Sequence, residues 1–289
     1  MVHQHLISNA KLLRADPTRT TGIVRRFVAD LRRRARKLIV AVSVFLDTED
    51  ELGLKEHTTL IRMARRTFAF RSDADKLKAF NEWFAQQVQL NVLSVPVGTD
   101  PSRPWTAQYV ESAYKRGLLN AYFSTKAGRE LGEFEQNQIS FLRAAFTSPE
   151  AVSKMRLLAT RSFEDLKGVT AQMSASMSRI LANGMAEGRN PRDIATTMRQ
   201  NLAKLTQQRA ELIARTEVIH AHADAQLDAF TKLGVKELGI QAELSTAGDD
   251  RVCSQCAALE GAVYPIEEAR NIIPVHPLCR CNWTPVTEP

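Results

Sequence analysis

Arg251–Cys256 reads RVCSQC and Pro274–Trp283 reads PVHPLCRCNW, and these two stretches hold all four cysteines of the 289-residue chain. The first pair is spaced C-x-x-C, the second is spaced C-x-C, and a histidine stands three residues before the second pair. Zinc prefers four sulfur or nitrogen ligands in a tetrahedron, and structural sites are commonly built from two such short pairs. The pattern predicts a structural Zn2+ site held by Cys253, Cys256, Cys279 and Cys281, with His276 as the alternative ligand.

Other interpretations of the cysteines stay open. Two disulfides would also explain an even number, but the N-terminal residues do not resemble a secretory signal peptide. Reduced, buried thiols are a second alternative, and a catalytic pair of one cysteine with His276 is a third. Pro274 and Pro277 flank His276 closely, which suits a rigid ligand loop as well as a catalytic one.

The segments around the cysteines have the pattern of short strands. We expect extended pieces at 240–244, 263–265 and 282–286, separated by turns at Gly248-Asp249-Asp250 and Glu260-Gly261. A sheet this small buries little apolar surface, so it needs a cross-link to be stable. The predicted metal site supplies that cross-link.

The rest of the chain has helical periodicity. We expect helices over 150–168 and 172–186, one opened by Asn190-Pro191, and a long one over 202–233 that ends at Gly234. Ser72 is a candidate N-cap for a helix that follows it. The predicted fold is therefore mainly α: a multi-helix N-terminal region plus a small α+β C-terminal region stapled by the cysteine-rich site.

Length and composition suit a folded chain of more than one domain. The chain is 44% apolar and 25% charged, and a proline-rich connector lies near residues 95–104. We expect a basic N-terminal helical region at 1–104, a central helical region at 105–184 and a C-terminal domain with the Cys/His cluster at 185–289.

Positive charge is concentrated near the N-terminus. Residues 1–80 hold 17 Lys and Arg against nine Asp and Glu, whereas the whole chain carries +7. Seven of these cations form a candidate contact for an acidic protein partner or for DNA: Arg25, Arg26, Arg32, Arg33, Arg34, Arg36 and Lys37. A solvated helix face is the third possibility.

An apolar run, Leu38–Leu46, follows these cations. It is far shorter than the roughly 20 residues that a membrane-spanning helix needs, so we expect no membrane contact. We interpret the run as a buried helix or as an exposed docking element beside the cations.

Arg215, Thr216 and Glu217 lie in the long helical segment, upstream of the cysteines. Arg215 and Glu217 are about 200° apart around a helix, so we expect them to contact different neighbours. No second carboxylate, nucleophile or phosphate-binding loop accompanies Glu217 at a recognisable spacing. A catalytic role for Glu217 is therefore the weaker hypothesis.

Together these stretches resemble the C-terminal domain of the phage Mu F-like head morphogenesis family, over residues 185–285. The resemblance rests on the pattern A-R-T-E, then D-x-R-V-C-x-x-C-x-x-L-x-G, then H-P-x-C-R-C. The matching family-motif residues include Arg215, Thr216, Glu217, Arg251, Gly261, His276, Pro277 and Arg280. His222 stands where this family commonly has asparagine.

The resemblance implies a phage minor head (minor capsid) protein. Such a protein is a low-copy virion component that associates with the portal protein, and with major capsid or scaffold protein, during assembly in the bacterial cytoplasm. It resides inside the capsid or at the portal vertex and is linked to handling or ejection of packaged double-stranded DNA. This role is structural and not enzymatic. The alternatives are a zinc-dependent nuclease or hydrolase, a toxin-like transferase using Arg215 and Glu217, and a free-standing DNA-binding protein.

Overall fold

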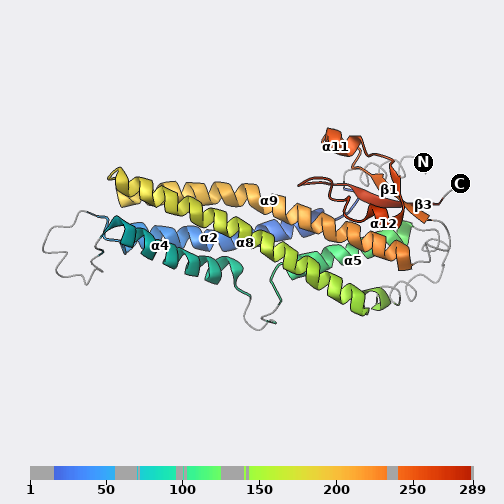
Figure 1. Ribbon diagram of the computed structural model, residues 1–289, viewed down its shortest axis with the longest axis horizontal. Coiled ribbons are helices and arrows are strands. Elements are labelled where there is room, and N and C mark those ends of the chain that lie inside the picture. The colour runs from blue at the N-terminus through green and yellow to red at the C-terminus, as the bar shows by residue number, and fades with distance from the viewer. Residues whose placement is uncertain are drawn as a thin grey trace, which may run out of the picture. The chain divides into compact units, whose positions relative to one another are not determined.

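The computed structural model describes residues 16–55, 70, 72–95, 100, 103–124, 140, 143–232 and 240–287. The fold is mainly helical, with a small antiparallel sheet near the C-terminus, which confirms the predicted fold class (Figure 1). The chain forms two compact units: unit 1 comprises the residues up to Phe27, Trp105–Phe163 and Glu211–Pro289, and unit 2 comprises Val28–Pro104 and Glu164–Ala210. The three-part division expected from the sequence stays a prediction.

Two long helices dominate the chain: α8 (Pro149–Ala186) and α9 (Pro191–Lys232). The start expected at Asn190-Pro191 is confirmed, and α8 begins at Pro149, one residue before the expected residue 150. Proline suits the first position of a helix, and Ser148 Oγ accepts the Ala151 N–H at 3.3 Å. The interruptions expected near 169–171 and before residue 202 are wrong, because α8 and α9 are continuous there. Gly168 costs α8 some intrinsic helix propensity, but a long helix with a buried apolar face tolerates one such residue.

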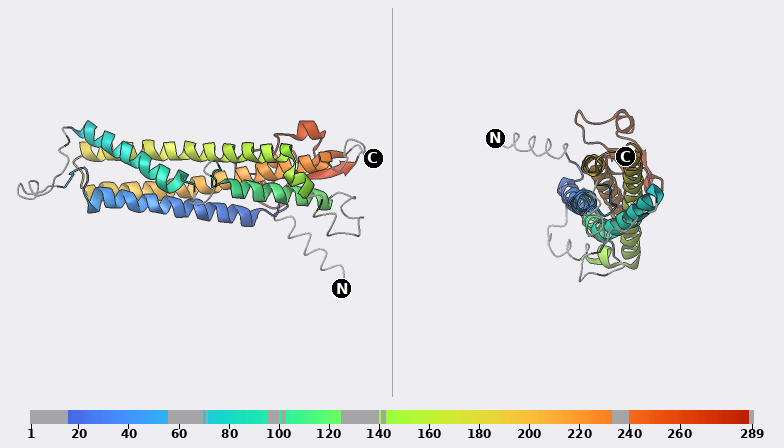
Figure 2. Two further views of the ribbon diagram at one scale, coloured as in Figure 1. Left: turned by 90° about the horizontal axis from the view of Figure 1, so that it is seen from below. Right: turned by 90° about the vertical axis from the view of Figure 1, so that its left-hand side faces the viewer.

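Unit 2 is a helical bundle. In it the segments of α2 (Thr21–Ser43), α4 (Asp73–Val88), α8 and α9 that belong to this unit run alongside one another (Figure 2). The π-helical turns η1 (Val44–Thr48) and η2 (Gln89–Leu93) extend α2 and α4. Ser72 is confirmed as the N-cap of α4, since its hydroxyl accepts the Asp75 N–H at 3.2 Å.

The apolar run Leu38–Leu46 belongs to the core of unit 2. Leu38, Val42 and Leu46 are each 0% exposed, and the Phe45 ring stacks on Trp83 with centroids 4.0 Å apart. The expectation of an exposed docking element is therefore wrong, and the alternative of a buried helix is confirmed. Only Val40, at 61%, is strongly exposed in this run.

A glycine allows α8 and α9 to approach closely where the chain turns between them. A Cβ on Gly184 would lie 2.6 Å from Ile194 Cγ1, so any larger residue would push the two helices apart. Gly188 closes α8 with φ of +64°, a conformation that glycine adopts without strain.

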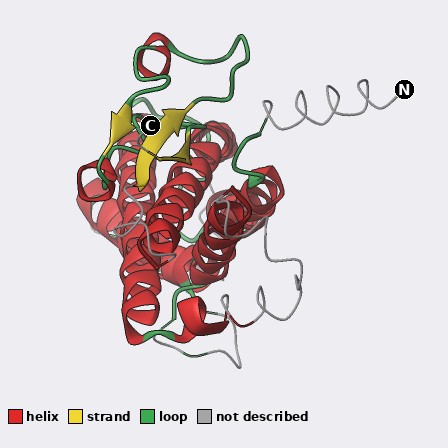
Figure 3. Ribbon diagram, turned by 90° about the vertical axis from the view of Figure 1, so that its right-hand side faces the viewer, coloured by secondary structure: helices red, strands yellow, loops and turns green. Residues whose placement is uncertain are grey.

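Unit 1 contains α5 (Ala107–Ser124), the remaining parts of α8 and α9, and the sheet. The strands are β1 (Ile240–Ser245), β2 (Val263–Tyr264) and β3 (Asn282–Thr287), in the antiparallel order β2-β1-β3 (Figure 3). The three short extended pieces expected from the sequence are thus confirmed. Two single-turn helices, α11 (Ser254–Ala257) and α12 (Ile266–Ala269), lie in the connections between strands.

The sheet is fastened to α9 by one side chain. Gln226 Nε2 donates to the Trp283 carbonyl at 3.0 Å, and the Trp283 N–H donates to Gln226 Oε1 at 3.2 Å. Both groups are buried, so the amide of Gln226 satisfies a backbone donor and acceptor that water cannot reach. These two hydrogen bonds hold β3, which directly follows Cys281, against α9 at Gln226.

Candidate metal centre

Two chain segments bring their cysteines together in residues 240–287, which we call the metal lobe. Cys253 caps the N-terminus of α11, because its sulfur accepts the Cys256 N–H at 3.4 Å, and Cys256 follows one turn later. The second segment is the loop before β3, where the Cys281 N–H donates to Cys279 Sγ at 3.4 Å. Each pair is thus held by a backbone hydrogen bond to its first sulfur.

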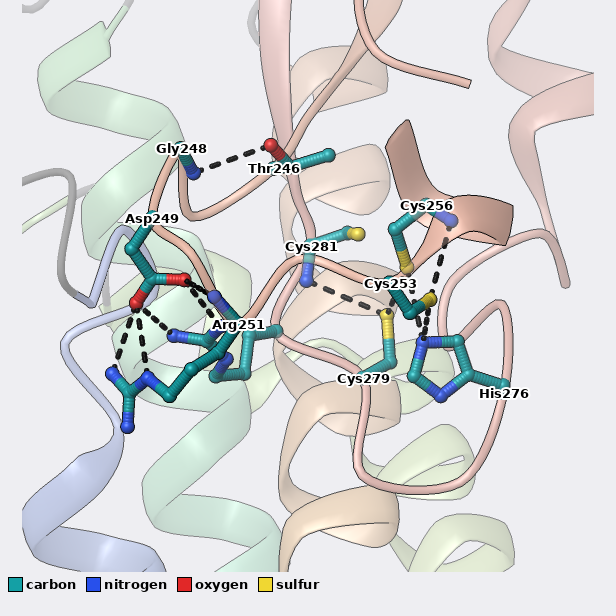
Figure 4. Close-up of polar contacts among 10 residues, drawn as sticks. Thr246, Gly248, Asp249, Arg251, Cys253, Cys256, His276, Cys279 and Cys281 are labelled. Atoms are coloured by element: carbon teal, nitrogen blue, oxygen red, sulfur yellow. Dashed lines mark hydrogen bonds and ion pairs between the residues drawn. The ribbon is translucent and has the colours of Figure 1, made fainter. Parts of the chain in front are cut away.

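The five candidate ligands form two overlapping groups. Cys253, Cys256 and His276 make one group, and Cys256, Cys279 and Cys281 make the other; within each group all ligand atoms lie within 4.8 Å of one another. Figure 4 shows the sulfurs of Cys253, Cys256 and Cys279 and the ring of His276 pointing toward one another. Among the residues that the structure describes, the predicted ligands therefore converge as the spacing indicated.

Distances between the ligand atoms match a tetrahedral site. Zn–S bonds of about 2.3 Å and Zn–N bonds of about 2.0–2.1 Å place two sulfurs about 3.8 Å apart, and a sulfur and a nitrogen about 3.5 Å apart. Cys256 Sγ lies 4.0 Å from Cys279 Sγ, and His276 Nε2 lies 3.1 Å from the sulfurs of both Cys253 and Cys256. Small shifts of these side chains would accommodate one ion.

Hydrogen bonding and burial set the pKa values of the thiols. A hydrogen bond from the Cys281 side chain, helped by the backbone N–H of Cys281, lowers the pKa of Cys279 to about 5. The backbone N–H of Cys256 lowers the pKa of Cys253, whereas burial raises the pKa of Cys256 to about 12. The side-chain hydrogen bond to Cys279, together with burial, raises the pKa of Cys281. The pKa of the first cysteine in each pair is thus lowered, which favours the thiolate form that binds metals.

An ion pair holds the two segments of the lobe in register. The guanidinium of Arg280 donates to both carboxylate oxygens of Asp249 at 2.7 and 2.6 Å, and Arg251 Nη2 lies 2.9 Å from the same carboxylate. The hydrogen bond from Arg280 holds the pKa of Asp249 well below its ordinary value. Arg280 and Arg251 of the family motif therefore orient the turn that precedes Cys253.

The lobe also contacts the family motif on α9. The Leu278 N–H donates to Thr216 Oγ1 at 3.3 Å, which joins the loop between His276 and Cys279 to the helix. Gly261, at φ of +75°, makes the left-handed turn that leads into β2. Pro277 accepts a hydrogen bond from His276 through its carbonyl oxygen at 2.6 Å.

Arg215 and Glu217 do have different neighbours. Arg215 pairs with Glu211 on its own helix at 2.8 Å, so it does not tie α9 to another element through this contact. Glu217 is 2% exposed and faces Arg161 of α8 at 3.6 Å. The two residues named for a transferase site therefore belong to separate networks.

Sequence reasoning missed a group of charged partners in unit 1. Asp228 accepts hydrogen bonds from Tyr114 at 2.6 Å and from Lys154 at 2.9 Å, and Arg270 lies 3.0 Å from it. Burial alone would raise the pKa of Asp228, but Lys154 and Tyr114 hold it below its ordinary value. The signal in the sequence was the spacing of polar residues three, seven and eleven positions after Glu217, which places His220, Asp224 and Asp228 along one side of α9.

His222, the departure from the family pattern, is part of the same polar interior. It is 0% exposed, and its Nε2 lies 3.0 Å from Asn120 Nδ2 of α5, so the ring nitrogen is the acceptor. Burial lowers the pKa of His222 to about 3. Gly117 of α5 permits this contact, because a Cβ there would lie 2.2 Å from the His222 carbonyl oxygen.

The N-terminal cations lie on α2, and six of them are exposed: Arg25, Arg26, Arg32, Arg33, Arg36 and Lys37. Arg33 pairs with Asp30 one turn earlier. Arg34 differs from the other cations, because it donates to the carbonyl oxygens of Ser94 at 3.0 Å and Val92 at 3.4 Å. The guanidinium of Arg34 therefore binds backbone carbonyls at the end of η2, within unit 2.

No helix in the part of the chain that the structure describes is long and apolar enough to cross a membrane.

Residues 175–284 match the family model described as Phage Mu protein F like protein, which confirms the resemblance carried by the motif residues. The matched range includes all of α9 and the metal lobe up to residue 284. No curated protein and no solved structure matches the chain.

Proposed function

We propose that this chain is a phage minor head protein: a low-copy component of the virion that binds the portal protein, acts in head assembly and takes part in handling or delivering packaged DNA. The observation that carries the proposal is the match of residues 175–284 to the Phage Mu protein F like family. Motif residues also make contacts beside the cysteine cluster. Thr216 accepts the backbone N–H of Leu278, and Arg280 donates to Asp249.

The proposal includes a structural Zn2+ in the metal lobe. Support comes from a donor set of sulfur and imidazole nitrogen, from its geometry and from the small size of the sheet. Four protein ligands would fill the coordination sphere of zinc, which leaves no position for a reacting water. This favours a binding role over the nuclease or hydrolase alternative.

The exposed cations of α2 are the proposed contact with the portal. Arg32, Arg36 and Lys37 share the exposed surface of the helix with Val40, so the surface combines charge with one apolar side chain. Such a surface suits an acidic and partly apolar protein, whereas attraction to DNA would require the charge alone.

The test is copurification of the portal protein with the full-length chain from infected cells, in the wild type and in variants. The triple substitution Arg32→Glu, Arg36→Glu and Lys37→Glu should weaken portal association at least tenfold at low salt, with a smaller loss at high salt. Val40→Asp should weaken association to a similar degree at every salt concentration, because apolar contact is not screened. Arg33 and Arg34 are left unchanged because both make contacts within the chain.

The matched control replaces three exposed cations of helices other than α2 with glutamate: Lys78 of α4, and Arg192 and Lys204 of α9. This variant carries the same net charge as the α2 triple variant and should bind the portal like the wild type. Equal loss in both triple variants would mean that net charge, and not a site on α2, governs association. Normal portal binding with lost DNA retention in the α2 variant would assign that face to DNA and overturn the proposed portal contact.

A further inference from the structure

We infer that the metal of the lobe is held by three cysteines and one histidine, Cys253, Cys256, Cys279 and His276, and that Cys281 is a neighbouring thiol outside the coordination sphere. The inference rests on the metal site proposed above. It differs from the four-cysteine set that the sequence predicted.

The hydrogen bond of His276 determines which ring nitrogen can bind a metal. Nδ1 lies 2.6 Å from the carbonyl oxygen of Pro277, and a carbonyl oxygen can only accept, so the proton is on Nδ1. Nε2 then carries a free electron pair, and it lies 3.1 Å from two of the cysteine sulfurs. A carbonyl that fixes the other ring nitrogen is the usual support of a metal-binding histidine.

Zinc takes four ligands, and Cys256 must be one of the four that are selected from the five candidates. Its sulfur is common to both groups of candidate ligands, so any ion that uses the whole cluster must contact it. Cys253 and His276 form one group with Cys256, so they supply two further ligands. The remaining choice is between Cys279 and Cys281 for the fourth position.

Cys279 fits the fourth position better than Cys281. Its sulfur lies 4.0 Å from Cys256 Sγ and accepts the backbone N–H of Cys281, an arrangement that mirrors Cys253 and the N–H of Cys256. In Figure 4 the sulfur of Cys281 lies on the side of the cluster away from the His276 ring. We therefore assign Cys279 as the fourth ligand of an ion placed between His276 and Cys256.

The ligand set has a chemical consequence. Three thiolates and a neutral imidazole around a dication leave a net charge of −1, whereas four thiolates leave −2. A buried site tolerates the smaller charge more easily, and Cys279 and Cys281 are both at most 2% exposed. Mixed sulfur and nitrogen donors favour zinc over softer, thiolate-selective metals.

X-ray absorption at the zinc edge of the purified full-length chain tests the inference directly. The expected result is three sulfurs at about 2.3 Å and one nitrogen at about 2.0–2.1 Å. A fit to four sulfurs would overturn the ligand set while leaving the metal site in place. Protein prepared under reducing conditions that holds no metal would instead overturn the metal site itself.

Two variants give an independent test with Co2+ as the probe. Cys281→Ser should bind one equivalent of Co2+ with the absorption spectrum of the wild type. His276→Cys should still bind the ion, but its spectrum should gain sulfur-to-cobalt charge-transfer intensity because a fourth thiolate joins the site. If Cys281→Ser loses the ion, Cys281 is a ligand, and if His276→Cys leaves the spectrum unchanged, His276 is not one. Either result would overturn the inference.

Discussion

The two units bury different kinds of side chains. Among the described residues of unit 2, the buried polar ones are Asp50, Thr170 and Thr206, and large apolar side chains fill the rest of the core. In unit 1 a single helix, α9, buries Glu217, His220, His222 and Gln226, and the metal lobe adds a cluster of sulfurs. An apolar core needs no specific partners, whereas each buried polar group costs free energy unless its partner is in place. Unit 1 should therefore depend on metal and pH, and unit 2 should not.

Removing the metal should have the largest effect and should be confined to unit 1. Cys256→Ser, or a chelator added to the wild type, should expose the region after residue 239 to protease, because structural zinc contributes about 10–16 kcal/mol in small domains. Limited proteolysis with mass spectrometry checks this, and the helices of unit 2 should stay protected. Ser254→Ala, an exposed change within the same C-x-x-C, is the control. Equal protection of the lobe in Cys256→Ser would mean that the sheet folds without a metal.

A substitution that leaves a cavity in unit 2 should lower the free energy of unfolding by less than removal of the metal does. The decrease should be the same with and without chelator. Leu181 of α8 is 0% exposed, so Leu181→Ala should lower the free energy of unfolding by about 2–5 kcal/mol. Leu157→Ala, on the same helix at 69% exposure, should change it by less than about 0.5 kcal/mol. Denaturant unfolding followed by circular dichroism measures both. A Leu181→Ala cost that grows on addition of chelator would show that the core of unit 2 depends on the metal.

Near neutral pH the smallest expected effect is the pH dependence that His222 gives to unit 1. Its folded-state pKa of about 3 lies below the ordinary value of 6.5, so the unfolded chain binds the proton first. Stability should fall as the pH drops below about 6.5, by at most about 1.4 kcal/mol per pH unit from this residue, and the loss should be complete near pH 3.

His222→Gln isolates this contribution, since glutamine cannot titrate but offers an acceptor to Asn120. The difference in stability between the variant and the wild type should shift in favour of the variant as the pH is lowered from 7 to 5. Hydrogen exchange of the α5 and α9 peptides follows unit 1, and peptides of α4 report on unit 2. A difference that stays constant with pH would mean that His222 has the same pKa in the folded and the unfolded protein.

Local signals predicted the helix starts and the five side chains that come together at the cysteine cluster. Ser72 acts through its own side-chain hydroxyl, Pro149 and Pro191 act through their fixed backbone geometry, and the C-x-x-C and C-x-C spacings are properties of short segments. The lengths of α8 and α9 were not predictable in the same way. Whether a helix continues through Gly168 depends on the neighbours that bury its apolar face, and these lie far away in the sequence.

The contacts of individual charged side chains could not be predicted from the sequence either. Arg34 has the same type and sequence context as Arg33, yet its contacts are with Ser94 and Val92, some sixty residues away. Asp228 and Lys154 are 74 residues apart, and no local pattern pairs them. The orientation of His276 could not be predicted from the sequence, because it depends on the Pro277 carbonyl, which only the three-dimensional structure places beside Nδ1.

The amide of Gln226 also determines what the sheet can associate with. β3 is an edge strand, and an unpaired edge is a template for strand addition by another chain. Here the outward N–H and carbonyl of Trp283 are taken by Gln226, and two residues later, on the same edge, Pro285 has no N–H to offer. At Trp283 and Pro285 the outer edge of β3 therefore offers no backbone N–H to a strand of another chain, which makes this edge a poor template for strand addition.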